Sequence, residues 1–216
     1  MLTNFSEQTS IINQYISELR DVKIQKDRMR FRKNMERIGQ FIAYEISKEL
    51  TYENKAIETP LGEAPTNVLA NQPVVATILR AGLPLHEGIL NTFDEADNAF
   101  ISAYRKHHKD GSFEINLQYI SCPKLENRPL IICDPMLATG ASMIKAVQEL
   151  ADYGKSSQIH IVTVIASAYG IEQVRRFFPK ARIWAGAIDE ELTAKSYIVP
   201  GLGDAGDLSY GSKLQE

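Results

Sequence analysis

An apolar run followed by small residues occupies positions 129–142, which read PLIICDPMLATGAS. The apolar residues 130–133 predict a buried strand, which carries Asp134 to its carboxyl end. A turn of small, flexible residues and the start of a helix follow. Backbone N–H groups in such a turn, together with the positive end of the helix dipole, form a phosphate-binding site. The alternative is an ordinary helix start capped by Thr139 or Ser142, and spacing alone does not separate the two.

Strand and helix patterns alternate through most of the chain. The predicted strands are 74–79, 99–104, 130–133, 159–165 and 183–188, and the predicted helices are 83–92, 144–151 and 171–178. This order implies right-handed crossovers and a mostly parallel sheet with helices on both faces. Such sheets bind ligands beyond the carboxyl ends of their strands. We therefore expect an α/β fold in one domain over residues 1–216.

Other segments flank or interrupt this alternation. Residues 1–50 predict two helices, the second of them over about 27–50, from apolar residues at helical spacing. Three prolines and a glycine predict irregular structure for Thr59–Pro73. Alternating apolar and polar residues, preceded by the turn signal Asp110-Gly111, predict a β-arm over 104–120.

Composition excludes several classes of protein. The 216 residues are 44% hydrophobic, but no stretch approaches about 20 consecutive apolar residues, so we expect no membrane span. The polar start lacks the features of a signal peptide, and we expect a cytoplasmic protein. A net charge of −3 does not suit a general nucleic-acid binder, although the stretch 23–37 is locally basic. Cys122 and Cys133 are expected to be reduced thiols rather than metal ligands.

The segment Asp134–Gly140 resembles the motif that binds phosphoribosyl pyrophosphate (PRPP) in the type I phosphoribosyltransferase family, and its wording is similar to the uracil branch. Many members carry two adjacent acids where this chain has Asp134 and Pro135, which leaves one carboxylate for the ribose hydroxyls. The resemblance implies a PRPP site made of Asp134, Pro135, Met136, Leu137, Ala138, Thr139, Gly140, Ala141 and Ser142.

Two arginines extend this resemblance. Residues 78–83, ILRAGL, are similar to the family loop that holds pyrophosphate, which implies that Arg80 binds PRPP and that a strained peptide bond lies near it. Ala103-Tyr104-Arg105 is similar to a strand end that carries a second PRPP-binding arginine, which implies this role for Arg105. The β-arm beyond it departs most from the family, and His107 and His108 receive no role. His86 and His160 are interpreted as structural.

Residues 197–207 read YIVPGLGDAGD. They contain the dinucleotide-binding pattern Gly-x-Gly-x-x-Gly, but only ten residues follow Gly206, so no βαβ unit can form. The string instead resembles the uracil-binding hood of the uracil enzymes, which here would span 190–216. The implied base contacts are Ile198, Gly203, Asp204 and Ala205. Asp204 would also lie near the ribose, PRPP or the base N1.

Together these resemblances imply a type I phosphoribosyltransferase-like fold and an enzyme that makes UMP and pyrophosphate from uracil and PRPP. The implied catalytic residues are Asp134, Arg80, Arg105 and Asp204. Mg²⁺ is expected to bind through PRPP and not through a protein ligand set. A homodimer or larger homo-oligomer is expected, and a GTP effector stays open. We expect no membrane or nucleic-acid partner. The alternative is an RNA-binding regulator of pyrimidine operons on the same scaffold, which the mild acidity and the hood disfavour.

Overall fold

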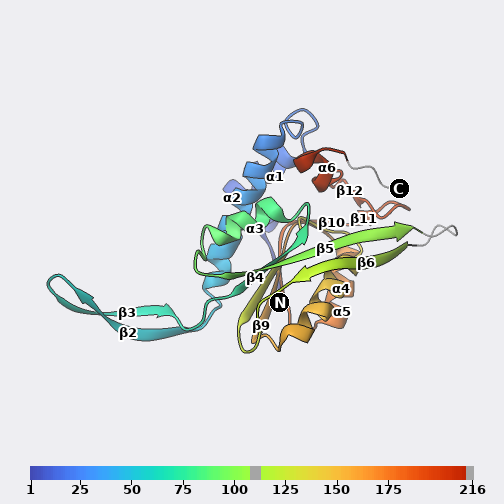
Figure 1. Ribbon diagram of the computed structural model, residues 1–216. Helices are drawn as coiled ribbons and strands as arrows, with labels where there is room; N and C mark the ends of the chain where they lie inside the picture. Colours follow the sequence, from blue (N-terminus) through green and yellow to red (C-terminus); the bar gives the residue numbers. More distant parts are fainter. Residues whose placement is uncertain (108–112, 213–216) are drawn as a thin grey trace.

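A mostly parallel sheet forms the centre of the computed structural model, which describes residues 1–107 and 113–212 (Figure 1). Its strands are ordered β1-β10-β9-β7-β4-β5-β6, and β8 pairs with β9. Neighbours are parallel except that β6 is antiparallel to β5. The strands are β1 Leu2–Asn4, β4 Val74–Leu79, β5 Asp97–His107, β6 Phe113–Ser121, β7 Pro129–Cys133, β8 Met136–Leu137, β9 Gln158–Ser167 and β10 Arg182–Asp189. The predicted fold class is confirmed.

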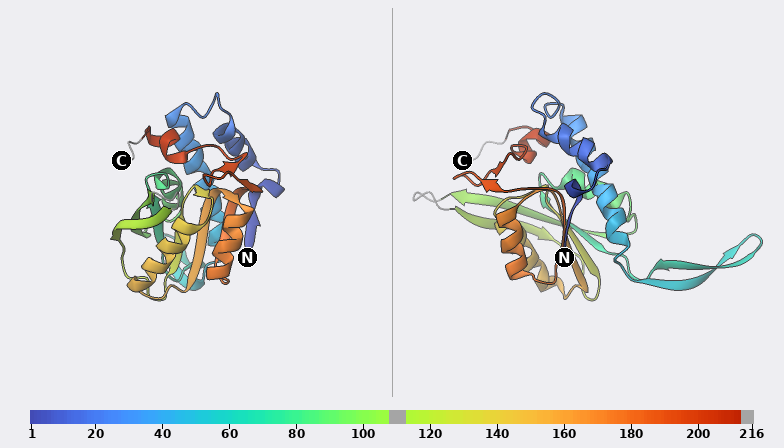
Figure 2. Two further views of the ribbon diagram at one scale, coloured as in Figure 1. Left: turned by 90° about the vertical axis from the view of Figure 1, so that its right-hand side faces the viewer. Right: turned by 180° about the vertical axis from the view of Figure 1, so that it is seen from behind.

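Helices cover both faces of this sheet (Figure 2). Helices α1 to α3 pack on one face, and α4 and α5 pack on the other. The helices are α1 Ile11–Arg20, α2 Arg28–Ser47, α3 Leu83–Leu90, α4 Ala141–Leu150, α5 Ala168–Phe177 and α6 Ala205–Tyr210, with short 3₁₀ turns at η1 Phe5–Glu7 and η2 Ala151–Tyr153. The two helices predicted before residue 50 are therefore present as α1 and α2.

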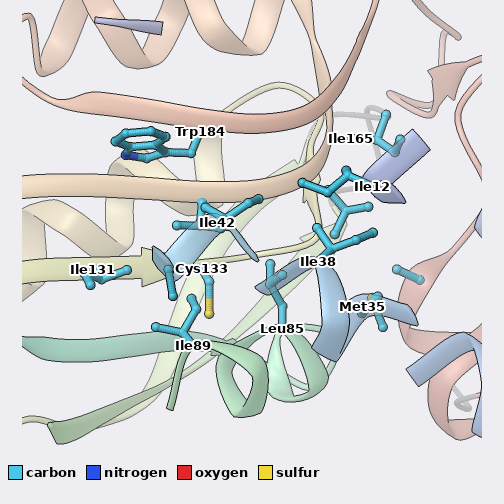
Figure 3. Close-up of a cluster of buried hydrophobic side chains, with 14 of the residues drawn as sticks. Ile12, Met35, Ile38, Ile42, Leu85, Ile89, Ile131, Cys133, Ile165 and Trp184 are labelled. Carbon is cyan, nitrogen blue, oxygen red and sulfur yellow. The ribbon is translucent and has the colours of Figure 1, made fainter. Parts of the chain in front are cut away.

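Alternation along the central strands explains how both faces become apolar. Val75 and Ile131 are paired and point toward α2 and α3, whereas the next pair, Ala76 and Ile132, points toward α4. Figure 3 shows the first of these layers, in which Ile131 lies near side chains of α2 and α3. Because both faces are covered, the free edge at the carboxyl ends of the strands is left for a ligand.

The joint between α1 and α2 is an ionic contact between the buried Glu18 and the half-exposed Arg30. Glu18 accepts hydrogen bonds from Arg30 Nε and Nη2, each at 2.8 Å, and from Asn34 Nδ2 at 2.7 Å. The hydrogen bonds from Arg30 and Asn34 outweigh the effect of burial and lower the pKa of Glu18 to about 2. The contact therefore fixes α1 against α2 with a carboxylate that stays ionised at neutral pH.

The segment Thr59–Pro73 corrects a prediction. It was expected to be irregular, but most of it belongs to an antiparallel hairpin of β2 Tyr52–Thr59 and β3 Gly62–Leu69, which projects from the body (Figure 1). Pro60 follows Thr59 at the turn, where proline is favoured. Pro65 pairs with Ala56, and in a two-stranded ribbon each strand is an edge, where proline is tolerated.

Two further strands differ from expectation. Residues 99–104 and the first half of the predicted β-arm form one strand, β5, whose pairing with β6 shifts register between Ser102 and Ala103. The arm is thus present in the backbone, while its predicted turn at Asp110-Gly111 lies outside the described residues. Strand β1 was not predicted, since its three residues hold a single large apolar side chain, Leu2. Within the described residues, 1–107 and 113–212, no helix has the length and apolar character that crossing a membrane requires.

His160 lies inside the sheet core, in agreement with its structural interpretation. Its Nδ1 accepts a hydrogen bond from Trp184 Nε1 at 3.2 Å, and its Nε2 lies 3.0 Å from Gln158 Oε1. Burial, with a smaller effect of the Arg182 charge, lowers the pKa of His160 to about 4. The folded protein therefore holds this ring neutral at a pH where an exposed histidine is protonated.

We expect this buried ring to make the protein acid-sensitive. Between pH 6.5 and about 4 the unfolded state binds a proton that folded His160 excludes, so the free energy of unfolding falls as pH falls through this window. The slope reaches up to about 1.4 kcal/mol per pH unit. A His160→Gln variant, which keeps an acceptor for Trp184, loses this contribution. Urea unfolding at several pH values measures the difference, and equal slopes in the two proteins would contradict the assignment.

Candidate active site

The order of the sheet reverses between β4 and β7. From β4 the chain continues to β5 and β6 on one side, and it returns to β7, β9 and β10 on the other. Parallel pairing of Thr77 with Cys133 places the carboxyl ends of β4 and β7 side by side. Arg80 directly follows β4, and Asp134 directly follows β7. Two residues predicted from separate motifs therefore lie at one switch point, where open α/β sheets bind ligands.

The segment after β7 is anchored to β9 before it turns. The Asp134 N–H donates to Val162 O at 3.1 Å, and Pro135 O accepts from the N–H groups of Val164 and Ile165. Met136 and Leu137 then form β8 against the end of β9. This pairing was not predicted, and it holds the backbone of the PRPP-type motif rigidly on the sheet up to Leu137.

The start of α4 has the form of an anion site. Its N-cap is Gly140, at φ +78°, rather than Thr139 or Ser142, so the alternative of an ordinary side-chain cap is not what the structure has. Thr139 Oγ1 accepts from Ala141 N–H at a long 3.4 Å, and Ser142 lies in the first turn. A glycine at the N-cap brings no side-chain oxygen, which leaves the N–H groups of this turn available to an anion.

The loop after β4 lies tightly against the two strand ends. The Leu79–Arg80 peptide bond is cis, at the place where an unusual bond was expected. A Cβ on Gly82 would lie 2.2 Å from Thr77 Oγ1 and 3.1 Å from Cys133 O, so only glycine lets the loop return over the strands here. The Arg80 side chain is 42% exposed, and its Nη2 lies 3.5 Å from Asp207 Oδ1 and donates to Gly211 O at 3.5 Å.

The predicted hood rises over the same edge. Short strands β11 Glu191–Leu192 and β12 Ile198–Val199 pair antiparallel, a cis Val199–Pro200 bond follows, and α6 comes next. Ile198 and Ala205 bury their side chains, whereas Gly203, at φ +94°, is exposed. What these residues offer a ligand is therefore chiefly backbone.

Asp204 is the N-cap residue of α6. Its Oδ1 accepts a hydrogen bond from Asp207 N–H at 2.9 Å. Arg80 Nη2 would lie 3.8 Å from a Cβ on Gly206, so the loop after β4 and the beginning of α6 are neighbours. The structure thus brings Arg80, Asp134 and the hood together at one edge.

For Arg105, the structure describes the backbone but not the side chain that was predicted to bind PRPP. Its backbone lies in β5 and pairs with Ile115, but the side chains of residues 103–107 and 113–117 lie outside the described ones. His107 shares this limit, and His108 lies outside the described residues altogether. The PRPP-binding role of Arg105 stays a prediction.

Sequence reasoning missed residues that hold the far end of the hood. Arg32 Nη1 donates to Ser209 O at 2.7 Å, and its guanidinium lies over the Tyr210 ring at 5.8 Å. Asp207 meets Arg80 as described above. The basic stretch 23–37 was the available signal, and Arg32 shows that part of it docks a helix rather than a free anion. Within residues 1–107 and 113–212, no group of three His, Cys, Asp or Glu side chains is arranged to hold a metal ion.

Known proteins resemble this chain along nearly its whole length. The family model described as uracil phosphoribosyltransferase matches residues 6–212. A uracil phosphoribosyltransferase of Porphyromonas gingivalis is 51% identical over 206 residues, which cover 95% of each protein. One of Thermococcus gammatolerans is 37% identical over 213 residues, which cover 97% of this chain and 93% of the relative. The solved structure of the AQ2163 protein of Aquifex aeolicus matches all of both chains with a TM-score of 0.88 at 29% identity.

Gly140→Ala tests the helix start. A side chain at φ +78° costs about 1–2 kcal/mol, and the new Cβ would lie 3.1 Å from Gly170 O. We expect a lower free energy of unfolding and weaker binding of inorganic pyrophosphate, measured by denaturant titration and calorimetry. Gly62→Ala is the control, because Gly62 also has positive φ but nothing lies within 4 Å of its Cβ position in the remote hairpin. Pyrophosphate affinity unchanged in Gly140→Ala would remove this turn from the anion site.

Proposed function

Because this chain belongs to the uracil phosphoribosyltransferase family, we propose that it transfers the 5-phosphoribosyl group of PRPP to uracil, giving UMP and pyrophosphate. The observation that supports this most directly is the meeting of two unlike surfaces at one sheet edge. A glycine-capped helix start suited to phosphate lies after β7, and a glycine-rich backbone suited to a base lies in the hood. Arg80 follows β4, the strand paired with β7, and its guanidinium reaches the hood at Asp207.

The phosphate half of the site meets the negative charge that builds on the leaving pyrophosphate. We assign this task to Arg80, the first-turn N–H groups of α4 and, as a prediction, Arg105. The half-exposed side chain of Arg80 makes long contacts of 3.5 Å to Asp207 Oδ1 and to Gly211 O, and a phosphate can replace them. Mg²⁺ carried on the oxygens of PRPP supplies further neutralisation of this charge when it is bound.

The sugar and the base are held from opposite sides. Asp134, at the end of β7, is assigned to the ribose hydroxyls, for which a carboxylate is a strong acceptor. The backbone of Ile198, Gly203 and Ala205 is assigned to the alternating carbonyl and N–H groups of uracil. One carboxylate oxygen of Asp204 already accepts the hydrogen bond that caps α6. We therefore assign Asp204 the role of orienting the ribose or the base, and not of removing a proton.

The alternative of an RNA-binding regulator is not supported. The relatives from Porphyromonas gingivalis and Thermococcus gammatolerans both carry the name of the enzyme uracil phosphoribosyltransferase. With a net charge of −3, the chain also lacks the excess of basic residues that is typical of RNA-binding proteins. A GTP effector and a cytoplasmic location stay predictions from the sequence.

Pyrophosphate release in the presence of PRPP and Mg²⁺ tests the reaction. We expect release with uracil and none with cytosine, hypoxanthine or no base. An Asp134→Asn variant is expected to lose about 100-fold or more in kcat/KM, because a misplaced ribose no longer presents its anomeric carbon. Asp94→Asn, an exposed acid that precedes β5, serves as the control. Release without uracil, or full activity in Asp134→Asn, would refute these assignments.

We also propose that the β2–β3 hairpin contacts a second copy of this chain. The hairpin projects away from the body, and Tyr52, Ile57 and Leu61 expose 43%, 41% and 99% of their surface (Figure 2). An isolated two-stranded ribbon is marginally stable in water, so a partner surface would account for its order.

A double variant, Ile57→Asp with Leu61→Asp, tests the hairpin contact. We expect its molar mass by light scattering to fall to that of the monomer, because two buried charges would oppose association. Tyr153→Asp, at an exposed large hydrophobic side chain in η2, is the control outside the hairpin. An unchanged oligomer in the double variant would exclude the hairpin from the interface.

A further inference from the structure

A buried ion pair lies beneath the hood. Arg20, the last residue of α1, donates from Nη1 and Nη2 to the two carboxylate oxygens of Asp189, both at 2.8 Å. Asp189 is the last residue of β10 and is 6% exposed. Such a two-point contact fixes the angle between the groups as well as their separation. It therefore ties the end of α1 to the carboxyl edge of the sheet.

Both members of this pair also bind one residue of the hood. Arg20 Nη1 donates to Gly201 O at 2.9 Å, and the Gly201 N–H donates to Asp189 Oδ2 at 2.9 Å. The carbonyl and the N–H of Gly201 are thus both hydrogen-bonded to the same ion pair. Gln25 adds a third contact, since its Nε2 donates to Leu202 O at 3.2 Å and to Leu19 O at 2.8 Å. We call Arg20, Asp189 and Gln25 the hood clamp.

The clamp holds the hood where its backbone is least adjustable. Gly201 has φ +56°, and a Cβ there would lie 2.2 Å from Ile198 O, so the turn from Ile198 to Gly201 is closed upon itself. A shift of Gly201 therefore carries Ile198 and Gly203 with it. The hood cannot supply this rigidity alone, because β11 and β12 have two residues each and α6 has six.

The charge state of the clamp is stable near neutral pH. Burial alone would raise the pKa of Asp189, but the hydrogen bonds from Arg20 and Gly201 N–H, with the Arg20 charge, outweigh it and lower that pKa. Asp189 therefore remains a carboxylate near neutral pH.

We propose that the hood clamp positions the base-reading backbone of Ile198, Gly203 and Ala205, and so determines the affinity for uracil without touching it. This inference rests on the proposed function. The phosphate turn at the start of α4, which belongs to the PRPP half of the site, is anchored separately through β8. Loss of the clamp should consequently weaken the binding of uracil far more than the binding of PRPP.

Asp189→Asn is the primary test, because it places an amide nitrogen against Arg20 or against the Gly201 N–H and breaks the two-point contact. We expect KM for uracil to rise about 10-fold or more, with KM for PRPP changed less than about 2-fold. Arg20→Lys, which retains the charge and one donor direction, should recover part of the uracil affinity that Arg20→Ala loses.

Glu18→Gln is a closely matched control. It also removes a buried carboxylate that binds an arginine at 2.8 Å, and it lies on the same helix, but its partners are in α1 and α2 and not in the hood. We expect it to lower the free energy of unfolding while KM for uracil stays within about 2-fold of the parent. Equal changes in both Michaelis constants for Asp189→Asn, or an equal uracil effect in Glu18→Gln, would overturn the proposal.

Gln25→Ala keeps the proposal testable if Asp189→Asn does not fold. It removes only neutral hydrogen bonds to Leu202 O and Leu19 O, and we expect about a 3-fold rise in KM for uracil with KM for PRPP unchanged. No change in KM for uracil would overturn the role of Gln25 and of the clamp. Failure of the parent protein to use uracil would instead refute the proposed function, which separates the two outcomes.

Discussion

The parallel pairing of β4 with β7 is the constraint on which the site depends. It sets the ends of two strands side by side although the chain runs through β5 and β6 between them. Gly82 makes this junction closer than any other residue would allow, because a side chain there would overlap Thr77 and the Cys133 carbonyl. The sheet therefore fixes the positions of Arg80 and Asp134, because both of its faces are buried and it has little freedom to shift.

The two halves of the site are built differently. The phosphate half is local: β7, β8 and the start of α4 follow one another within a few residues, and the backbone itself supplies the donors. The base half is a short segment that relies on α1, α2 and β10 for its place. Substitutions far from the hood in sequence can therefore alter the base half while the phosphate half keeps its geometry.

This difference also explains what the sequence could predict. Helices and buried strands can be predicted from the spacing of apolar residues, and the Asp134–Ser142 motif can be recognised because its residues are contiguous in the sequence. The contact of Arg20 with Asp189 joins residues 169 positions apart and leaves no local pattern. Asp189 is the last residue of a strand and Asp134 directly follows one, and this position at a strand end was the one signal available. The β2–β3 hairpin was missed because its prolines and polar residues suit a loop equally well, and only its pairing makes it a ribbon.

The hood also has a consequence for synthesis on the ribosome. Strand β1 can pair only after β10 has been made, and the end of α1 can bind Gly201 only later still, so residues 2–20 find these partners only after residues 182–201 have emerged. A nascent chain that has emerged through β9 contains every residue of the phosphate half but none of the hood. The base half of the site therefore depends on contacts between segments far apart in the sequence, and such distant contacts are the kind that slow folding.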